Sequence, residues 1–169
     1  MLIPTLETAR LILKPPSADD YSVYKAFYEN KDASKAYGGP LSHFLSWKKL
    51  AADVGHWHLK GFGMWSLYEK STGDMIGGCG LVWPEAYPRS ELTWWIIPSA
   101  RRKGFALEAS KAATQFAYDV LRWDMVETHM NDDNHAARKL VLKLGGEIIV
   151  RTDFPDGIAR NVYRIPRPE

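Results

Sequence analysis

Apolar residues recur with two different periods along the first half of the chain, and each period predicts a different kind of element. Alternation typical of a strand covers residues 10–14, and Pro15 and Pro16 end it. Helical spacing follows twice, with Ser17 and Ser42 as the expected N-cap residues. The expected order is a strand at 10–14, helices over about 18–28 and 43–54, and a hairpin of strands 64–69 and 75–82.

The second half of the chain alternates strands and helices more regularly. Strand-like runs cover residues 91–97 and 125–130, and helical patterns follow at 104–121 and 134–144. Gly145 and Gly146 end the second helix, as a left-handed C-cap requires. Two last strands are expected at 147–152 and 158–165. This order predicts an α/β (α+β) fold, a mixed sheet of about six or seven strands flanked by about four helices, in one domain spanning residues 1–169.

Composition restricts the class of protein without identifying it. The 169 residues are 46% hydrophobic, which is enough for one domain with a sizeable core. A net charge of +2 is too small for a protein that binds nucleic acid through a broad basic surface. The single cysteine, Cys79, excludes an internal disulfide and fits a reducing compartment. Because no signal peptide or membrane-spanning stretch is expected either, the prediction is a cytoplasmic protein.

The junction between the strand at 91–97 and the helix from 104 carries the strongest chemical signal. Pro98 ends the strand, and Gly104 and Ala106 let another molecule come close to the backbone. The first helical turn leaves amides unpaired and favours negative charge. Three cations lie beside these amides, Arg101, Arg102 and Lys103. The segment therefore predicts a site for a phosphorylated ligand, and the alternative is a solvated basic turn.

Five short motifs, in order along the chain, resemble those of the GNAT (Gcn-related N-acetyltransferase) family. The resemblance extends over essentially the whole chain, and it is nearest to the branch of the ribosomal-protein N-terminal acetyltransferases (RimJ/RimL-like). The residues that carry it are 101–106 for Arg/Gln-x-x-Gly-x-Gly/Ala, 6–13 for TxRLxLR, 91–96 for EIGYWI, 104–109 for GxAxEA, and 134–137 with 143–145 for NxxS…KLGF.

The resemblance implies acetyl-coenzyme A (acetyl-CoA) as donor and a sheet splayed between its fourth and fifth strands. The pantetheine arm would pair with the exposed main chain of the fourth strand like an added strand. That main chain would also hold the acetyl oxygen as the tetrahedral intermediate forms. Asn134 would bind the cofactor across the cleft, or serve only as an N-cap. The implied cofactor-binding residues are Trp95, Ile96, Ile97, Arg101, Arg102, Lys103, Gly104, Phe105, Ala106 and Asn134.

Glu91 is the candidate general base. Acetylation needs a free amine, and an α-amine titrates near ~8 whereas a lysine titrates near ~10.4. A carboxylate could take the proton directly or through water. Glu91 begins the fourth strand, where family members often carry such a glutamate, and alternation places it on one face with Thr93, Trp95 and Ile97. The alternative is an exposed strand-end carboxylate without a catalytic role.

Two positions depart from the family pattern. Many members carry a tyrosine acid after the asparagine, and the alignment places Val141 there, while Ala137 replaces the serine of the branch. Neither side chain can donate a proton. The expected function is transfer of an acetyl group to a primary amine, on a protein N-terminus or a small molecule, by direct attack. The alternative from a different class is a catalytically weak domain that binds acyl-CoA as a sensor or interaction module.

Acceptor recognition is expected from the first two helices, the segment between them, and the loop 83–90. The aromatic residues of these regions could line an amine site or equally be core. His56 and His58 face apart on a helix, so no metal site is expected, and His129 and Cys79 are interpreted as structural. No membrane or nucleic-acid partner is expected, and the protein is expected to be a monomer or homodimer. The aromatic residues are Tyr28, Tyr37, Trp47, Trp57, Trp83 and Tyr87.

Overall fold

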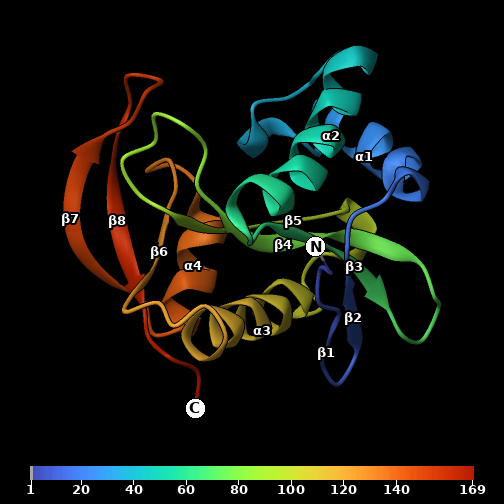
Figure 1. Ribbon diagram of the computed structural model, residues 1–169. Helices are drawn as coiled ribbons and strands as arrows, with labels where there is room; N and C mark the ends of the chain where they lie inside the picture. Colours follow the sequence, from blue (N-terminus) through green and yellow to red (C-terminus); the bar gives the residue numbers. More distant parts are fainter. Residues whose placement is uncertain (1) are drawn as a thin grey trace.

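The computed structural model describes residues 2–169 and places their strands in two sheets (Figure 1). The larger sheet has the order β1-β2-β3-β4-β5, the smaller one the order β6-β8-β7, and every ladder is antiparallel. The bounds are Leu6–Glu7 for β1, Leu11–Lys14 for β2, Met64–Glu69 for β3, Met75–Val82 for β4, Glu91–Ile96 for β5, Val126–His129 for β6, Glu147–Asp153 for β7 and Ala159–Ile165 for β8.

Helices cover both faces of the larger sheet. Helices α1 (Tyr21–Tyr28) and α2 (His43–Lys60) lie on one side, and α3 (Phe105–Asp119) lies on the other, as Figure 1 shows. Helix α4 (His135–Lys143) leads into the smaller sheet. None of the helices in residues 2–169 combines the length and the apolar character needed to cross a bilayer.

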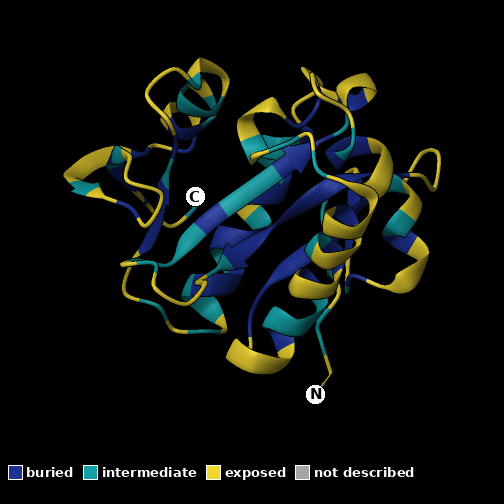
Figure 2. Cartoon of the chain, turned by 90° about the horizontal axis from the view of Figure 1, so that it is seen from above, coloured by how far each residue is buried: buried dark blue, intermediate teal, exposed yellow. Residues whose placement is uncertain are grey.

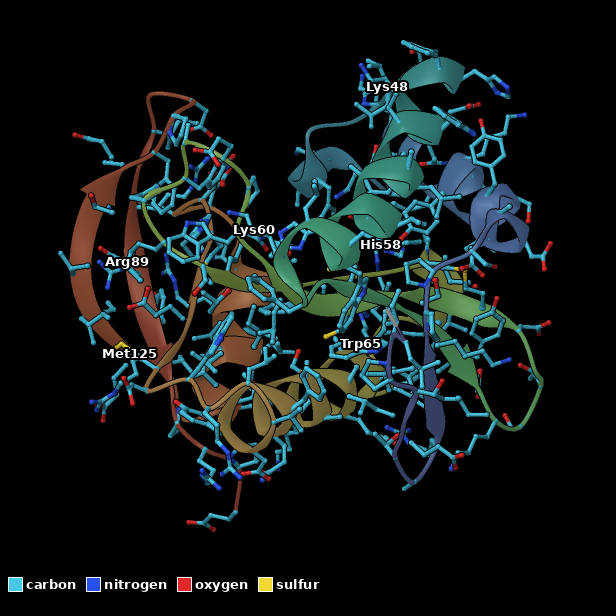
Figure 3. The ribbon with its side chains drawn as sticks, in the orientation of Figure 1. Lys48, His58, Lys60, Trp65, Arg89 and Met125 are labelled. Carbon is cyan, nitrogen blue, oxygen red and sulfur yellow. The ribbon has the colours of Figure 1, made fainter. Side chains whose placement is uncertain are left out.

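The core is formed by two clusters of buried side chains on opposite faces of the larger sheet. Trp65 points from β3 toward α3, where its ring lies 5.1 Å from that of Phe116 (Figure 3). On the other face, the ring of Trp95 lies 4.6 Å from Phe27 and 4.9 Å from Tyr24 of α1. In Figure 2 the central strands of the larger sheet are largely buried, whereas the outward faces of the helices are exposed. Strand β5 is therefore held on both faces, which fixes its main chain.

The two sheets separate between β5 and β6, the strands that α3 connects. No ladder joins these strands in the described residues. One contact holds them near the start of β5, where the Thr128 hydroxyl donates to the Leu92 carbonyl at 2.7 Å. Beyond Leu92, the outer edge of β5 has no strand partner. This is the splay that the family resemblance implied.

The α/β (α+β) fold class predicted from the sequence is confirmed, but the strands form two antiparallel sheets instead of one mixed sheet. Each predicted helix and strand is present, with ends shifted by a few residues except at α2, which runs to Lys60 before Gly61 ends it at φ +79°. Ser42 caps α2 by accepting the Leu45 amide at 3.2 Å. The sequence did not predict β1, because two residues are too few to show a period.

Candidate active site

The loop after β5 has a backbone conformation suited to binding an anion. A single turn (Pro98–Ala100) leads into residues 101–104, here called the basic loop. Arg102 and Gly104 both have left-handed φ values, +61° and +83°. In a turn with left-handed residues, successive backbone amides can point toward a common anion. Helix α3 begins at the next residue, Phe105.

The amides of the basic loop and of the first turn of α3 are free. Within residues 2–169, the amides of residues 102–107 donate to no carbonyl and no side chain. The first helical bond runs from the Glu108 amide to the Gly104 carbonyl at 3.1 Å. The free donors lie at the positive end of the helix dipole. The residues therefore fit a phosphate group, as the sequence predicted for Arg102, Lys103, Gly104, Phe105 and Ala106.

The Arg101 side chain was expected to direct its charge to the ligand, but its guanidinium binds main-chain carbonyls of the protein instead. Its Nε donates to the Ile96 carbonyl at 3.0 Å, and its Nη2 donates to the Ala33 carbonyl at 2.9 Å. The guanidinium also lies 6.0 Å from the ring of Phe27. The side chain thus ties the end of β5 to the segment after α1. Arg102 and Lys103 are exposed, and neither takes part in an ion pair with another of residues 2–169.

The hydrogen bonds of β5 decide which of its main-chain groups remain available. The Ile97 amide donates to the Ile76 carbonyl of β4 at 2.9 Å, so it is not free for a ligand. The Leu92 carbonyl points the opposite way, to β6. Since main-chain groups alternate between the two edges of a strand, Trp95 faces β4, whereas Trp94 and Ile96 face the gap. Two of the three predicted main-chain partners therefore face β4, and the sequence analysis missed Trp94.

Side-chain directions on β5 follow the predicted alternation. Trp95 packs in the cluster under α1 with Ile97 at its border, and Leu92 and Ile96 pack in the cluster under α3. Glu91 shares the face of Trp95, on the side of α1 and α2. A carboxylate, an unpaired strand edge and a loop whose geometry suits an anion therefore follow one another from the start of β5 to the start of α3.

Asn134 caps α4. Its Oδ1 accepts the Ala137 amide at 3.1 Å, so the N-cap role is confirmed. No hydrogen bond from its side-chain NH₂ group is found within residues 2–169. This group can still donate to a ligand, so the second predicted role stays a prediction.

Glu91 faces His129 across the gap between the sheets. The Glu91 Oε2 and His129 Nε2 atoms are 3.3 Å apart, and the side chains are only 18% and 9% exposed. The ring of His129 lies 4.0 Å from that of Phe154, in the loop between β7 and β8, and 6.4 Å from that of Tyr87. The sequence analysis interpreted His129 as structural, because nothing in the chain order places β6 opposite the start of β5. Its partner is the candidate base.

The loop 83–90 is fixed beside this pair. The Trp83 amide donates to His56 Nε2 at 2.9 Å, and His56 Nδ1 lies 2.6 Å from the Phe62 carbonyl. Arg89 holds the Glu127 carboxylate of β6 with two hydrogen bonds of 2.6 and 2.5 Å (Figure 3). His56 is therefore an anchor of the loop. Within residues 2–169 no three His, Cys, Asp or Glu side chains gather as metal ligands.

A buried polar network fixes α1 and α2 above β5. Asp53 is 3% exposed, and it accepts hydrogen bonds from the Tyr24 hydroxyl at 2.9 Å and the Lys49 ammonium at 3.1 Å. Burial opposes the charge of Lys49, but Asp53, followed by Tyr28 and Glu91, raises the pKa of the ammonium above its usual value. The Glu91 carboxylate therefore lies close enough to α2 for its charge to act on the Lys49 ammonium.

The aromatic residues expected near the acceptor separate into core and surface. Trp57 and Tyr28 are 1% and 2% exposed and belong to the core. Trp47 and Trp83 are 53% and 43% exposed. Tyr37 packs edge-on against Phe27 at 5.4 Å. Burial raises the pKa of Tyr37 to about 12 although Arg101 opposes this, so its hydroxyl stays protonated at neutral pH. Of the aromatic residues expected near the acceptor, Tyr87 lies beside the Glu91–His129 pair, with its ring 6.4 Å from that of His129.

Val141 and Cys79 contribute no reactive group. Val141 is fully buried in the core, so its position offers no acid. Cys79 is fully buried 3.8 Å from the Ser110 hydroxyl. Burial raises the pKa of the Cys79 thiol to about 12, and the Ser110 hydrogen bond lowers it only in part.

The Cys79 thiol is expected to be unreactive in the folded protein. At pH 8 a disulfide reagent should label no thiol in the native state and one thiol in guanidinium, where the pKa returns to about 8.5. Because the folded pKa is raised, the thiol favours the native state below about pH 8.5, and this contribution is lost as the pH rises toward 12. Rapid labelling of the native protein would show that the site is accessible.

Comparison with known proteins places the chain in a family. A family model described as an acetyltransferase (GNAT) domain matches residues 10–147. The chain therefore belongs to the GNAT acetyltransferase family. The family membership predicted from the sequence motifs is confirmed.

Relatives of similar length match over nearly the whole chain. An uncharacterized N-acetyltransferase of Bacillus subtilis, YoaA, is 25% identical over 177 residues, covering 99% of each chain. The structure of an acetyltransferase from Agrobacterium tumefaciens is 27% identical with a TM-score of 0.89, covering 98% of this chain and 96% of that one. The ribosomal L7/L12 α-N-protein acetyltransferase RimL, solved in complex with coenzyme A, shares the fold at 12% identity and a TM-score of 0.76, over 95% and 97% of the chains.

Proposed function

We propose that this chain transfers an acetyl group from acetyl-CoA to a primary amine, with Glu91 as general base. One observation carries the proposal. The free edge of β5 leads from the Glu91 carboxylate at one end to the free amides of residues 102–107 at the other. Free amides at a helix N-terminus can bind the phosphates of a nucleotide, and a carboxylate can remove the proton of an amine before it is acetylated. The protein acts as one domain, and its single buried cysteine fits a cytoplasmic setting.

Acetyl-CoA is the substrate that spans these groups. Its pyrophosphate would bind the amides of the basic loop and of the first turn of α3, with Arg102 and Lys103 supplying charge. Its pantetheine amides would pair with the main chain of Trp94 and with the amide of Ile96, since the Ile96 carbonyl already accepts the Arg101 side chain. The free NH₂ group of Asn134 would donate from the other side. The buried packing of β5 keeps this edge rigid without a ligand.

The chemistry is a direct transfer. The acceptor enters protonated, and Glu91 removes the proton directly or through a water molecule. The amine nitrogen then bonds to the thioester carbonyl carbon. As the C–S bond breaks, the nitrogen loses its second proton to water, and the departing thiolate takes up a proton from water. The Trp94 amide, which faces the gap and lies closer along β5 to Glu91 than the Ile96 amide does, would donate to the carbonyl oxygen as it becomes negative. Protein N-termini and small amines are the two acceptor classes.

The proposal is tested by release of free coenzyme A thiol from acetyl-CoA, with a panel of peptides bearing free N-termini and of small amines. Turnover that requires one class of acceptor is the expected result. Tight binding of acetyl-CoA without acceptor-dependent thiol release would favour the sensor alternative. Absence of any thermal stabilisation by coenzyme A would contradict both functions.

A further inference from the structure

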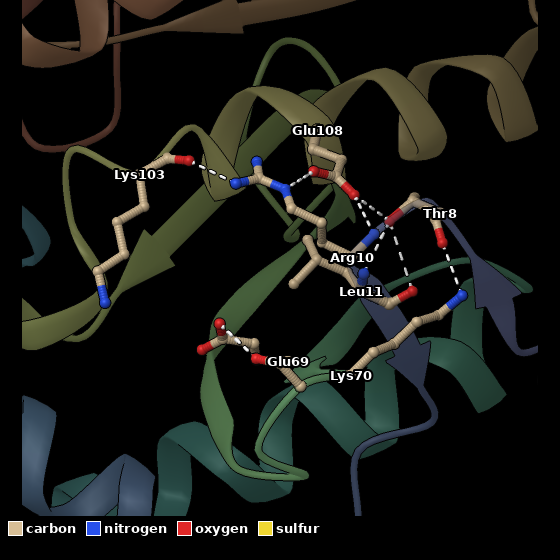
Figure 4. A network of polar contacts seen from close by, with 8 residues as sticks. Thr8, Arg10, Leu11, Glu69, Lys70, Lys103 and Glu108 are labelled. Atoms are coloured by element: carbon tan, nitrogen blue, oxygen red, sulfur yellow. Dashed lines mark hydrogen bonds and ion pairs between the residues drawn. The ribbon is translucent and has the colours of Figure 1, made fainter.

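A network of hydrogen bonds joins the start of the chain to the first turn of α3 (Figure 4). The Glu108 Oε1 atom accepts from the Thr8 hydroxyl at 2.6 Å and from the Arg10 amide at 2.7 Å. Its Oε2 atom accepts from Arg10 Nε at 2.7 Å. The Thr8 hydroxyl also accepts the Leu11 amide at 3.0 Å, which fixes its direction. Two motifs nearly a hundred residues apart thus meet at a single carboxylate.

Arg10 extends this network to the basic loop. Its Nη1 donates to the Lys103 carbonyl at 2.8 Å, and its guanidinium lies 4.5 Å from the ring of Phe105. A peptide group is planar and trans, so the carbonyl of Lys103 and the amide of Gly104 point in opposite directions. Because Arg10 holds the carbonyl, it turns the Gly104 amide to the opposite side. One of the free donors of the loop is thereby oriented before any ligand binds.

The same network compensates a charge that would otherwise repel a phosphate. Glu108 lies one turn into α3, close to the free amides. Partial burial opposes its ionisation, but the Thr8 hydroxyl and Arg10 outweigh this and lower the pKa of the carboxyl. Glu108 is therefore ionised at neutral pH. Arg10 balances its charge and binds the loop with the rest of its guanidinium.

We infer that Arg10 and Glu108 are positioning residues for the pyrophosphate of coenzyme A. They preorganise the basic loop without touching the ligand, so that the Gly104 amide and its neighbours point outward in the free protein. The inference rests on the proposed function, because it concerns how the same substrate is recognised. It gives residues outside the loop a role in recognition of the phosphorylated half of the donor, which they support by orienting the loop amides.

The decisive variant is Arg10→Lys, which keeps the charge but cannot span both Glu108 and the Lys103 carbonyl. Calorimetry should show the Kd of coenzyme A rising roughly tenfold, the scale of one lost hydrogen bond to a charged group. S-acetylpantetheine has the same thioester and arm but no phosphate. Its kcat/KM should stay within about twofold of wild type, as for a distant surface substitution. Thr8→Val should weaken coenzyme A binding in the same direction by about threefold.

Arg167→Lys is the matched control. Arg167 pairs with Asp119 at 2.5 Å at the other end of α3, and it lies 5.5 Å from the ring of Tyr118. Like Arg10, Arg167 pairs with a carboxylate of α3 and stacks on an aromatic ring of α3, so the two substitutions remove the same kinds of contact. Arg167→Lys should leave the Kd of coenzyme A unchanged.

Three results would overturn the inference. Arg10→Lys could bind coenzyme A as wild type does. Both Arg10→Lys and Thr8→Val could lose S-acetylpantetheine activity as strongly as coenzyme A affinity, which indicates a general structural defect. If wild type itself binds no coenzyme A, the proposed function fails first, and that result is distinguishable from the other two.

Discussion

Replacing Glu91 with glutamine is expected to lower kcat by about two orders of magnitude, the range of a lost general base. Glutamine keeps the size of the side chain and its place beside His129 but cannot take a proton. The remaining rate should rise with pH up to the pKa of the acceptor amine, because hydroxide then supplies the free amine. The KM for acetyl-CoA should change little, since Glu91 lies at the opposite end of β5 from the basic loop. Steady-state rates between pH 6 and 10 check this.

Two further variants separate proton transfer from local packing. Glu147→Gln changes an exposed carboxylate that pairs with Arg164 in the smaller sheet, and it should leave kcat unchanged. His129→Gln removes the imidazole 3.3 Å from Glu91 and should lower kcat by a smaller factor. If the two side chains act together, the double variant should be no slower than Glu91→Gln. A turnover and pH profile of Glu91→Gln equal to those of wild type would show that Glu91 is not the base.

Replacing Gly104 with valine is expected to abolish measurable binding of coenzyme A. Gly104 has φ +83°, and a Cβ built on it lies 3.3 Å from Arg10 Nη2. A β-branched residue disfavours this conformation by at least about 1–2 kcal/mol. The backbone can relax only by turning the Gly104 and Phe105 amides, which removes donors from the phosphate site. Calorimetric titration with coenzyme A measures the loss.

Gly61→Val controls for the strain itself. Gly61 has φ +79° at the end of α2, and a Cβ there meets nothing within 4 Å. The two variants should lose similar amounts of stability, about 1–3 kcal/mol. Only Gly104→Val should lose coenzyme A binding. Equal loss of binding in both would mean that the effect comes from destabilisation alone.

Local rules were sufficient to predict most of the fold from the sequence. Ser42 and Asn134 cap their helices as predicted, and Gly145 ends α4 at φ +79°. These features depend on neighbours within a few residues. The position of the basic loop between β5 and α3 was predictable for the same reason.

What the sequence could not predict depends on partners distant in the chain. Arg101 is directed toward the segment after α1 because the Ala33 carbonyl, 68 residues away, accepts its Nη2. His129 meets Glu91 only because α3 carries the chain from β5 to β6. The Ile97 amide is not free because it donates to the Ile76 carbonyl of β4, whereas the main-chain groups of Trp94 face the gap. This difference depends on the register between β4 and β5. Register and side-chain direction across the sheet leave no local pattern.

The central claim is that the edge of β5 and the free amides after it form one binding site for the donor. Amide chemical shifts of isotope-labelled protein, recorded as coenzyme A is added, test this most directly. The largest shifts are expected at the amides of residues 102–107 and at those of Trp94 and Ile96. The Ile97 amide, bonded to β4, should shift less than that of Ile96. Saturating coenzyme A that leaves the amides of residues 102–107 unshifted, or that shifts only residues of β7 and β8, would contradict the claim.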